Sequence, residues 1–218
     1  KKALLIGATG LTGSHCLQEL SDDNVFNQIE AWVRKPLEIS HPKPKCVIMD
    51  FKNISEIAST DATHVFCCLG TTIRKAGSQA AFREVDFEYV AELAKLAERS
   101  HAEKFLVISS IGANAESGSF YLRVKGEMEE AVSKIPFESV KIFRPSLLLG
   151  DRDKSRPAEA LAIFFVKALS VLLFLGGMHR CGAIRAETVA EAMLRAATQT
   201  RKGVEIIESE SIESFGRF

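Results

Sequence analysis

A glycine-rich loop directly behind the first apolar run constrains the fold of this chain more than any other feature. The run Ala3–Ile6 predicts a buried strand, and Leu11–Leu20 has the pattern of a helix. The loop carries a glycine at every third position and reads Gly7, Ala8, Thr9, Gly10, Leu11, Thr12 and Gly13. Glycines there permit a tight turn and let backbone N–H groups and the helix N-terminus approach a pyrophosphate. The order strand, glycine loop, helix favours a dinucleotide-binding site over a purely structural turn.

Short apolar runs alternate with helical stretches along the rest of the chain. Further strands are expected at Ile29–Val33, Cys46–Met49, His64–Leu69, Lys104–Ile108, Val140–Phe143 and Val204–Ile207. Helices are expected near Ile54–Ala58 and over Phe82–Arg99, Tyr121–Val132 and Glu187–Thr198. Strands that are apolar throughout are typical of a parallel sheet covered on both faces. The sequence therefore predicts an α/β fold with a doubly wound parallel sheet, in a single domain over residues 1–218.

The alternation loosens after Pro145, and residues from about 151 to 200 are expected to contribute a small substrate lobe. Residues 160–177 are almost entirely apolar, with Lys167 near the centre. A membrane span would place that lysine in hydrocarbon at a cost of about 2.5–3.5 kcal/mol, so a buried or pocket-forming helix is favoured. Peripheral membrane contact and a homo-oligomer contact stay open as alternatives, although an interfacial helix should carry a strongly charged face.

Charge and cysteine content exclude several classes of protein. Lys+Arg and Asp+Glu both number 28, so the basic excess of a broad nucleic-acid binder is missing and no nucleic-acid partner is expected. The five cysteines form no C-x-x-C pair and have no histidine cluster nearby, which disfavours a disulfide framework or a metal site. No secretion signal precedes the first strand. Free thiols in a reducing compartment, and a cytoplasmic location, are therefore expected.

Two cations follow the second predicted strand, where a dinucleotide-binding fold sets its cofactor preference. An NAD site usually places an acid there for the ribose 2′-OH, but this strand ends in Arg34 and Lys35, which suit a 2′-phosphate. The pair predicts NADP(H) over NAD(H), with a solvated basic turn as the alternative. Asp50, behind the third strand, could approach the adenine or cap the next helix. Gly70, behind the fourth, would let cofactor sugars and phosphates pass close to the backbone.

A serine pair and a Tyr-x-x-x-Lys spacing supply a candidate catalytic group. Ser109 and Ser110 follow the fifth strand, and Tyr121 and Lys125 share one face of the next helix. A tyrosine serves as acid or base only if its pKa falls well below about 10, and a neighbouring ammonium favours that fall. A serine hydroxyl would hold the substrate oxygen while the cofactor carries the hydride. A surface lysine beside a half-buried tyrosine is the alternative interpretation.

Together these motifs resemble those of an atypical short-chain dehydrogenase/reductase, and more narrowly the Tat-interacting-protein group with its bacterial relatives. The matching segments span nearly the whole chain: Gly7–Gly13, Arg34–Lys35, Phe66–Thr72, Lys75–Gly77, Ser109–Ala113, Tyr121–Glu127, Phe143–Pro145, Asp151–Arg152 and Ser155–Pro157. The resemblance implies a Rossmann fold with bound NADPH. It also implies cofactor contacts from Thr9, Gly10, Leu11, Thr12, Arg34, Lys35, Gly70, Thr71, Leu148 and Arg156.

The resemblance further implies that Tyr121 donates or accepts the proton, that Lys125 holds the nicotinamide ribose, and that Ser110 rather than Ser109 completes the group. Two functions follow. The first is an NADPH-dependent oxidoreductase acting on a carbonyl or alcohol of a small molecule, which the apolar residues 161–175 suggest is hydrophobic. The alternative is an NADP(H)-binding regulatory or scaffold protein with little or no turnover. The intact tyrosine–lysine pair favours the enzyme, because a pure sensor has no need of it.

Overall fold

The first strand lies inside a sheet of seven parallel strands in a computed structural model that describes residues 1–150 and 182–215. In chain order the strands are β1 (Lys2–Ile6), β2 (Gln28–Val33), β3 (Pro44–Ile48), β4 (His64–Cys67), β5 (Lys104–Ile108), β6 (Ser139–Arg144) and β9 (Gly203–Glu208). Across the sheet they are ordered β3-β2-β1-β4-β5-β6-β9. The order reverses between β1 and β4, as in a Rossmann fold, and confirms the predicted doubly wound sheet.

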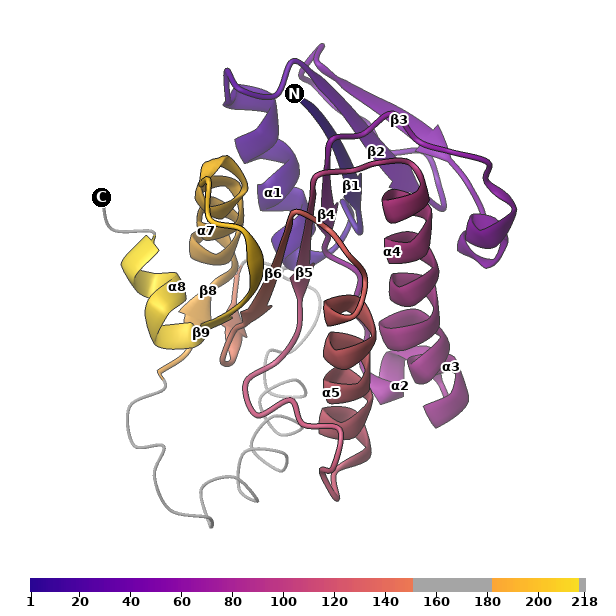
Figure 1. The fold of residues 1–218 in the computed structure, drawn as a ribbon, viewed down its shortest axis with the longest axis vertical. Coiled ribbons are helices and arrows are strands. Elements are labelled where there is room, and N and C mark those ends of the chain that lie inside the picture. Colours follow the sequence, from indigo (N-terminus) through magenta and orange to yellow (C-terminus); the bar gives the residue numbers. More distant parts are fainter. Residues whose placement is uncertain (151–181, 216–218) are drawn as a thin grey trace.

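Helices cover both faces of this sheet (Figure 1). One face carries α1 (Leu11–Asp22), α7 (Ala186–Thr198) and α8 (Ser209–Phe215), and α7 packs against both of the others. The other face carries the 3₁₀ helix η1 (Phe51–Glu56), α4 (Tyr89–Arg99) and α5 (Phe120–Ser133), with the short helices α2 (Ile73–Ala76) and α3 (Gln79–Arg83) beside them. The sheet is therefore shielded from water on both sides along its centre.

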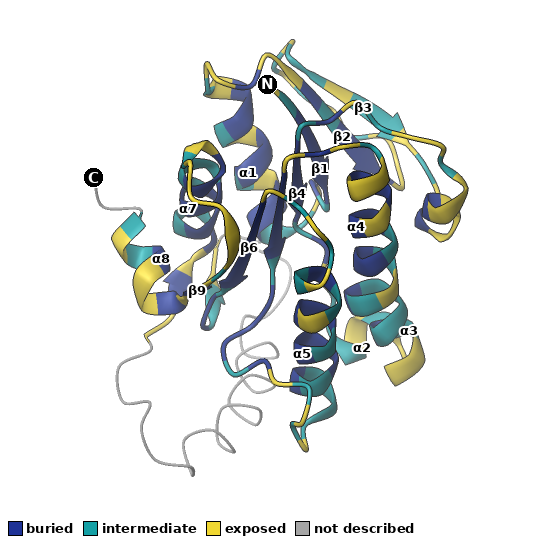
Figure 2. Cartoon of the chain, in the orientation of Figure 1, coloured by how far each residue is buried: buried dark blue, intermediate teal, exposed yellow. Residues whose placement is uncertain are grey.

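Two apolar cores explain why the central strands lack polar alternation. Ala3 and Leu5 of β1 pack into the core formed with α1 and α7, whereas Leu4 and Ile6 pack into the core formed with α4 and α5. Each fully buried leucine or isoleucine side chain contributes about 1.5–3 kcal/mol of transfer free energy. Figure 2 shows the central strands dark blue between helices whose outer surfaces are exposed. This burial fixes the carboxyl ends of β1, β4 and β5 side by side.

The expected helix Phe82–Arg99 is not regular. α3 ends at Arg83, and residues Glu84–Glu88 form a π-helical turn, η2, before α4 begins at Tyr89. The Tyr89 N–H donates to the carbonyl oxygen of Glu84, which widens the turn by one residue. The prediction of one continuous α-helix is therefore wrong at this turn. Asp86 lies on this turn and is buried in the protein interior.

Behind β6 the chain enters the region expected to form a substrate lobe. Two-residue strands, β7 (Leu148–Leu149) and β8 (Ile184–Arg185), pair in parallel there and were not expected from the sequence. Residues 186–198 of the expected lobe form α7, which packs on α1 beside the main sheet. The expectations for Arg156 and for residues 160–177 lie outside the described residues, and the lobe stays a prediction.

Candidate cofactor site and active site

The glycine loop has a shape that only glycine permits at two positions. Gly7 has a φ of +87°, and a Cβ there would lie 2.4 Å from the Cys68 carbonyl oxygen. A Cβ on Gly13 would lie 2.0 Å from the Gly7 carbonyl oxygen. Gly10 closes the turn, because its N–H donates to the same Gly7 oxygen at 2.8 Å. Backbone therefore replaces side chains throughout this loop, as a bound pyrophosphate requires.

The start of α1 is suited to a negatively charged ligand. No side chain caps this helix, whose N-cap residue is Gly10, and its first turn carries no acid. Thr12 is buried, and its Oγ1 has no hydrogen-bond partner within the described residues. An orphaned buried hydroxyl costs free energy unless a ligand satisfies it. Together with the helix dipole, Thr12 therefore fits a phosphate group held at this terminus.

The carboxyl ends of β2 and β3 carry the residues expected at the adenosine end of a cofactor. Arg34 and Lys35 are both exposed where β2 ends. The Asp50 carboxylate accepts a hydrogen bond from the Lys52 N–H at 3.1 Å and caps η1, which is one of the two roles left open by the sequence. Tyr89 lies near the Arg34 and Asp50 charges, and burial together with the neighbouring Glu84 raises the pKa of Tyr89 to about 12.

Three residues expected to be catalytic come together beyond the carboxyl ends of β4 and β5. The Ser110 hydroxyl and the Lys125 ammonium both lie close enough to the Tyr121 hydroxyl to lower its pKa. Lys125 Nζ also donates to the carbonyl oxygen of Ile108 at 3.4 Å. The other serine, Ser109, is buried, and its Oγ has no partner within the described residues. The geometry thus brings Ser110, rather than Ser109, to the tyrosine.

Asp86 also belongs to this group, although none of the sequence motifs includes it. Its Oδ1 lies 2.8 Å from Lys125 Nζ, and the two side chains are only 1% and 4% exposed. Its Oδ2 accepts the Thr71 N–H at 2.9 Å. One signal was available: Asp86 continues the buried stripe of Val90, Leu93 and Ala97 at helical spacing. A carboxylate on such a stripe is costly to bury without a partner.

The surrounding charges act on Tyr121 in opposite directions. Burial raises the pKa of Tyr121, and the Asp86 carboxylate raises it further, whereas Lys125 and Ser110 lower it. The net shift is upward. Burial would lower the pKa of Lys125, but Asp86 and Tyr121 outweigh it, so that pKa is raised and the lysine stays charged. The lysine thus stabilises a tyrosinate, as expected, but Asp86 offsets much of that effect.

The loop between β5 and α5 packs directly on α5. A Cβ on Gly126 would lie 2.1 Å from the backbone nitrogen of Ala115, so no larger residue fits beneath the loop. The Asn114 N–H donates to the carbonyl oxygen of Leu122 at 3.1 Å. The Phe82 ring packs on the Tyr121 ring with centroids 5.4 Å apart. These contacts fix the distance between Ser110, at the start of the loop, and Tyr121, at its end.

Three further positions considered in the sequence, Gly70, Leu148 and Cys67, lie in or next to strands. Gly70 lies directly behind β4, where a Cβ would meet Asp86 Oδ1 at 3.7 Å. Leu148 is half-buried at the start of β7. Cys67 is buried, and burial raises the pKa of its thiol to about 12, which fits the expected packing role. In the part of the chain that the structure describes, no cluster of metal-ligating side chains is found.

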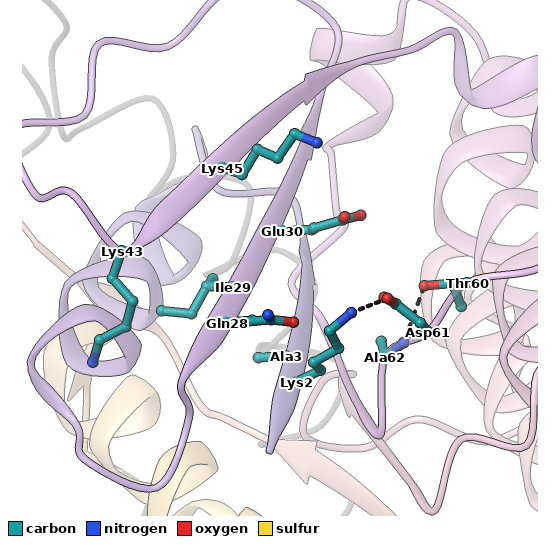
Figure 3. Close-up of a pocket in the computed structure, with 10 residues that line it drawn as sticks. All are labelled: Lys2, Ala3, Gln28, Ile29, Glu30, Lys43, Lys45, Thr60, Asp61 and Ala62. Carbon is teal, nitrogen blue, oxygen red and sulfur yellow. Dashed lines mark hydrogen bonds and ion pairs between the residues drawn. The ribbon is translucent and has the colours of Figure 1, made fainter.

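A polar cavity of about 400 Å³ lies at the opposite, amino-terminal ends of the strands (Figure 3). It is lined by Lys2, Ala3, Gln28, Ile29, Glu30, Lys43, Lys45, Thr60, Asp61 and Ala62. The Lys2 ammonium pairs with the Asp61 carboxylate there. The cavity contains none of the predicted site residues. The described helices also include none long and apolar enough to cross a membrane.

The fold and the glycine loop define the class of this protein: it is an NAD(P)-binding Rossmann protein with an oxidoreductase-like fold. The model of the NAD(P)H-binding family matches residues 7–151, which is more than half of the chain, and the chain belongs to that family.

Two curated relatives narrow the class. Protein HTATIP2 of Rattus norvegicus is 35% identical over 223 residues, an alignment that covers 100% of this chain and 90% of the relative. The protein fmp52, mitochondrial, of Emericella nidulans is 36% identical over 173 residues, covering 76% and 74%. The resemblance to the Tat-interacting-protein group is thereby confirmed.

Solved structures agree with the fold. MoeE5 in complex with UDP-glucuronic acid and NAD superposes with a TM-score of 0.71 at 17% identity, over 95% of this chain and 76% of the other. The UDP-glucuronic acid 4-epimerase of Bacillus cereus in complex with NAD gives 0.69 at 14% identity, over 95% and 76%. At these identities the similarity establishes the fold alone.

The expected cytoplasmic location is wrong by the same comparisons. The relatives of Emericella nidulans, Scheffersomyces stipitis and Debaryomyces hansenii all carry the word mitochondrial in their names. The expectation rested on free cysteines and a missing secretion signal, and both features are equally compatible with other reducing compartments.

Proposed function

We propose that this protein is an NADP(H)-dependent oxidoreductase of the short-chain dehydrogenase/reductase type, acting on a carbonyl or alcohol of a small apolar molecule. The observation that carries the proposal is the group formed by Ser110, Tyr121 and Lys125, in which Ser110 and Lys125 both lie close to the Tyr121 hydroxyl. It lies behind β4 and β5, on the same edge of the sheet as the glycine loop. Ligands of open α/β sheets bind along that edge.

Each side chain has a defined task in this proposal. The bound nicotinamide would supply or accept the hydride. The Tyr121 hydroxyl would donate a proton to the substrate oxygen in reduction and take it back in oxidation. The Ser110 hydroxyl would hydrogen-bond that oxygen and keep it beside Tyr121. The Lys125 ammonium would hold the nicotinamide ribose and stabilise the tyrosinate.

Cofactor preference is assigned to the exposed cations behind β2. Arg34 and Lys35 would contact the 2′-phosphate, which NAD(H) lacks. The glycine loop would hold the pyrophosphate through Thr9, Gly10, Leu11 and Thr12, and the orphaned Thr12 hydroxyl supports this assignment. Gly70, Thr71, Leu148 and Arg156 are proposed along the ribose and nicotinamide, and Asp50 keeps a proposed adenine contact beside its capping role.

Thermal unfolding in the presence of NADPH, NADP⁺, NADH or NAD⁺ tests the cofactor assignment. A ligand that binds only the folded state stabilises it by about 2.7 kcal/mol at a hundredfold excess over Kd. We expect that shift with the phosphorylated pair, and its loss in Arg34→Ala/Lys35→Ala. The matched control is Arg201→Ala/Lys202→Ala, which removes a second exposed arginine–lysine pair at the far edge of the sheet. Equal shifts with all the nucleotides would refute the preference for NADP(H).

A regulatory, NADP(H)-sensing role is the second candidate, and one observation favours it. The Asp86 carboxylate pairs with Lys125, and the pKa of Tyr121 is raised rather than lowered. Tyr121→Phe separates the two roles, because it removes the transferable proton and leaves the ring packing on Phe82. Loss of carbonyl reduction with unchanged NADPH binding supports the enzyme. An unchanged cellular phenotype in Tyr121→Phe, with loss of that phenotype in Arg34→Ala, supports the sensor.

A further inference from the structure

The buried acid on the π-helical turn has no assigned task in the oxidoreductase reaction proposed above. We propose that Asp86 is a positioning residue of the active site: it holds the Lys125 ammonium in place and sets how readily Tyr121 ionises. The inference deepens the proposed function and takes its catalytic meaning from it. The ionisation itself is a property of the folded chain and can be measured without cofactor or substrate.

The carboxylate joins the two segments that flank the site. Its Oδ1 pairs with Lys125 of α5 at 2.8 Å, and its Oδ2 accepts the N–H of Thr71, in the loop behind β4, at 2.9 Å. Lys125 in turn reaches the carbonyl oxygen of Ile108, at the end of β5. One carboxylate thus connects the proposed nicotinamide side of the cofactor site with the helix that carries Tyr121.

The position depends on the π-helical turn. η2 packs against both α4 and α5. The Arg83 guanidinium, one residue before the turn, pairs with Glu127 of α5 and lies 4.4 Å from the centre of the Phe87 ring. These contacts fix the turn against α5 on either side of Asp86. π-Helical turns are frequently found at functional sites, and this one carries a buried carboxylate.

Because the Asp86–Lys125 pair is buried, its charges act strongly on neighbouring groups. At 1% and 4% exposure, the two charges are little screened by water. Among the residues that the structure describes, the ionisable groups around Asp86 are Lys125 and Tyr121 on α5 and Cys67 on β4, and the Ser110 hydroxyl also lies beside Tyr121. Because Asp86 neutralises the only cation among them, it limits the stabilisation that Lys125 gives to a tyrosinate.

The tyrosine content of the chain makes a direct test feasible. The sequence contains two tyrosines, and both lie in the described residues, so Tyr89→Phe leaves Tyr121 as the single tyrosine chromophore. In that background, tyrosinate absorbance is titrated with pH while circular dichroism reports the fold. We compare Asp86→Asn with Glu88→Gln. The second substitution removes one carboxylate from the same turn at an exposed position.

We expect Asp86→Asn to ionise Tyr121 at least about one pH unit lower, a roughly tenfold rise in the tyrosinate fraction at a given pH, because Lys125 then takes Tyr121 as its counterion. Glu88→Gln should leave the titration unchanged. An unchanged midpoint in Asp86→Asn, or loss of the proton from Lys125 without formation of tyrosinate, would overturn the inference.

Removing one partner of a buried ion pair can unfold a protein, so a second comparison is required. Lys125→Met and Asp86→Asn/Lys125→Met are titrated in the same background, since the double variant leaves no charge of the pair behind. The carboxylate of the single variant should hold the Tyr121 midpoint above that of the double variant, and equal midpoints would refute a direct effect of Asp86. None of these titrations uses a nucleotide, so a failed cofactor assignment leaves their outcome intact.

Discussion

Gly126→Ala is the sharpest structural test of how the active site is held together. The added Cβ would lie 2.1 Å from the Ala115 nitrogen and 2.2 Å from the Asn114 carbonyl carbon, whereas ordinary contact begins at 3.4 Å. Both atoms are backbone, so no rotamer change relieves the clash and the loop must move by on the order of 1 Å. Overpacking of this kind costs about 1–3 kcal/mol. The higher helix propensity of alanine returns about 1 kcal/mol, which leaves a net loss of up to about 2 kcal/mol.

Denaturant unfolding measures this loss as a lower midpoint at unchanged slope. The displaced loop also weakens the bond from Asn114 N–H to the Leu122 oxygen and moves Ser110 away from Tyr121. A misplacement of about 1 Å can lower a rate by about a hundredfold, so turnover should fall more steeply than stability. Gly118→Ala is the matched control, because nothing lies within 4 Å of its added Cβ. A Gly126→Ala variant as stable as an ordinary alanine-substituted helix would refute the close packing of loop on helix.

Two further predictions concern buried polar groups. Burial, with the nearby Lys1 and Lys104, lowers the pKa of His64 from 6.5 to about 4, so between these pH values His64 is protonated in the unfolded chain but not in the folded chain. The free energy of unfolding should therefore fall by as much as about 3 kcal/mol as pH drops from 6.5 to 4. His64→Gln should flatten this part of the curve of stability against pH. Thr12→Val removes the orphaned hydroxyl at nearly constant volume, so the unliganded protein should melt at the same or a higher temperature while its NADPH affinity drops about tenfold. Unchanged affinity would show that the hydroxyl contacts no phosphate.

The fold was predictable because its signals are local. Runs such as Ala3–Ile6 and Lys104–Ile108 are apolar at every core position, and the helix Tyr121–Val132 was located to within one residue at each end. The glycine loop was also predictable, because Gly7 and Gly13 are required by close backbone contacts within one strand–turn–helix unit and with the residue that follows the neighbouring strand. Features of this kind depend on short stretches of sequence and on periodicity.

The parts that the sequence did not reveal depend on contacts between distant segments. The sequence around Asp86 does not indicate the π-helical turn, because the partners of the Asp86 carboxylate, Thr71 and Lys125, belong to other segments of the chain. Gly126 reads as one more residue of a helix until the loop at Asn114 is found against it. The two-residue strands β7 and β8 lie 36 positions apart in register and carry no periodic signal of their own.

The Tyr121–Lys125 spacing therefore predicts that these two side chains meet, but it does not predict the third charge, on Asp86, that acts on both. A lysine alone would favour the tyrosinate, whereas a lysine already paired with Asp86 favours it much less. The same carboxylate also accepts the Thr71 N–H, so it links the loop at Gly70 and Thr71 to Lys125. The enzymatic and the sensing candidates then differ in one measurable quantity, the ionisation of Tyr121 with and without bound nucleotide. A marked fall in the Tyr121 pKa on nucleotide binding would support catalysis, because a tyrosine with a lower pKa exchanges its proton more readily near neutral pH, and a pKa that stays raised would support sensing.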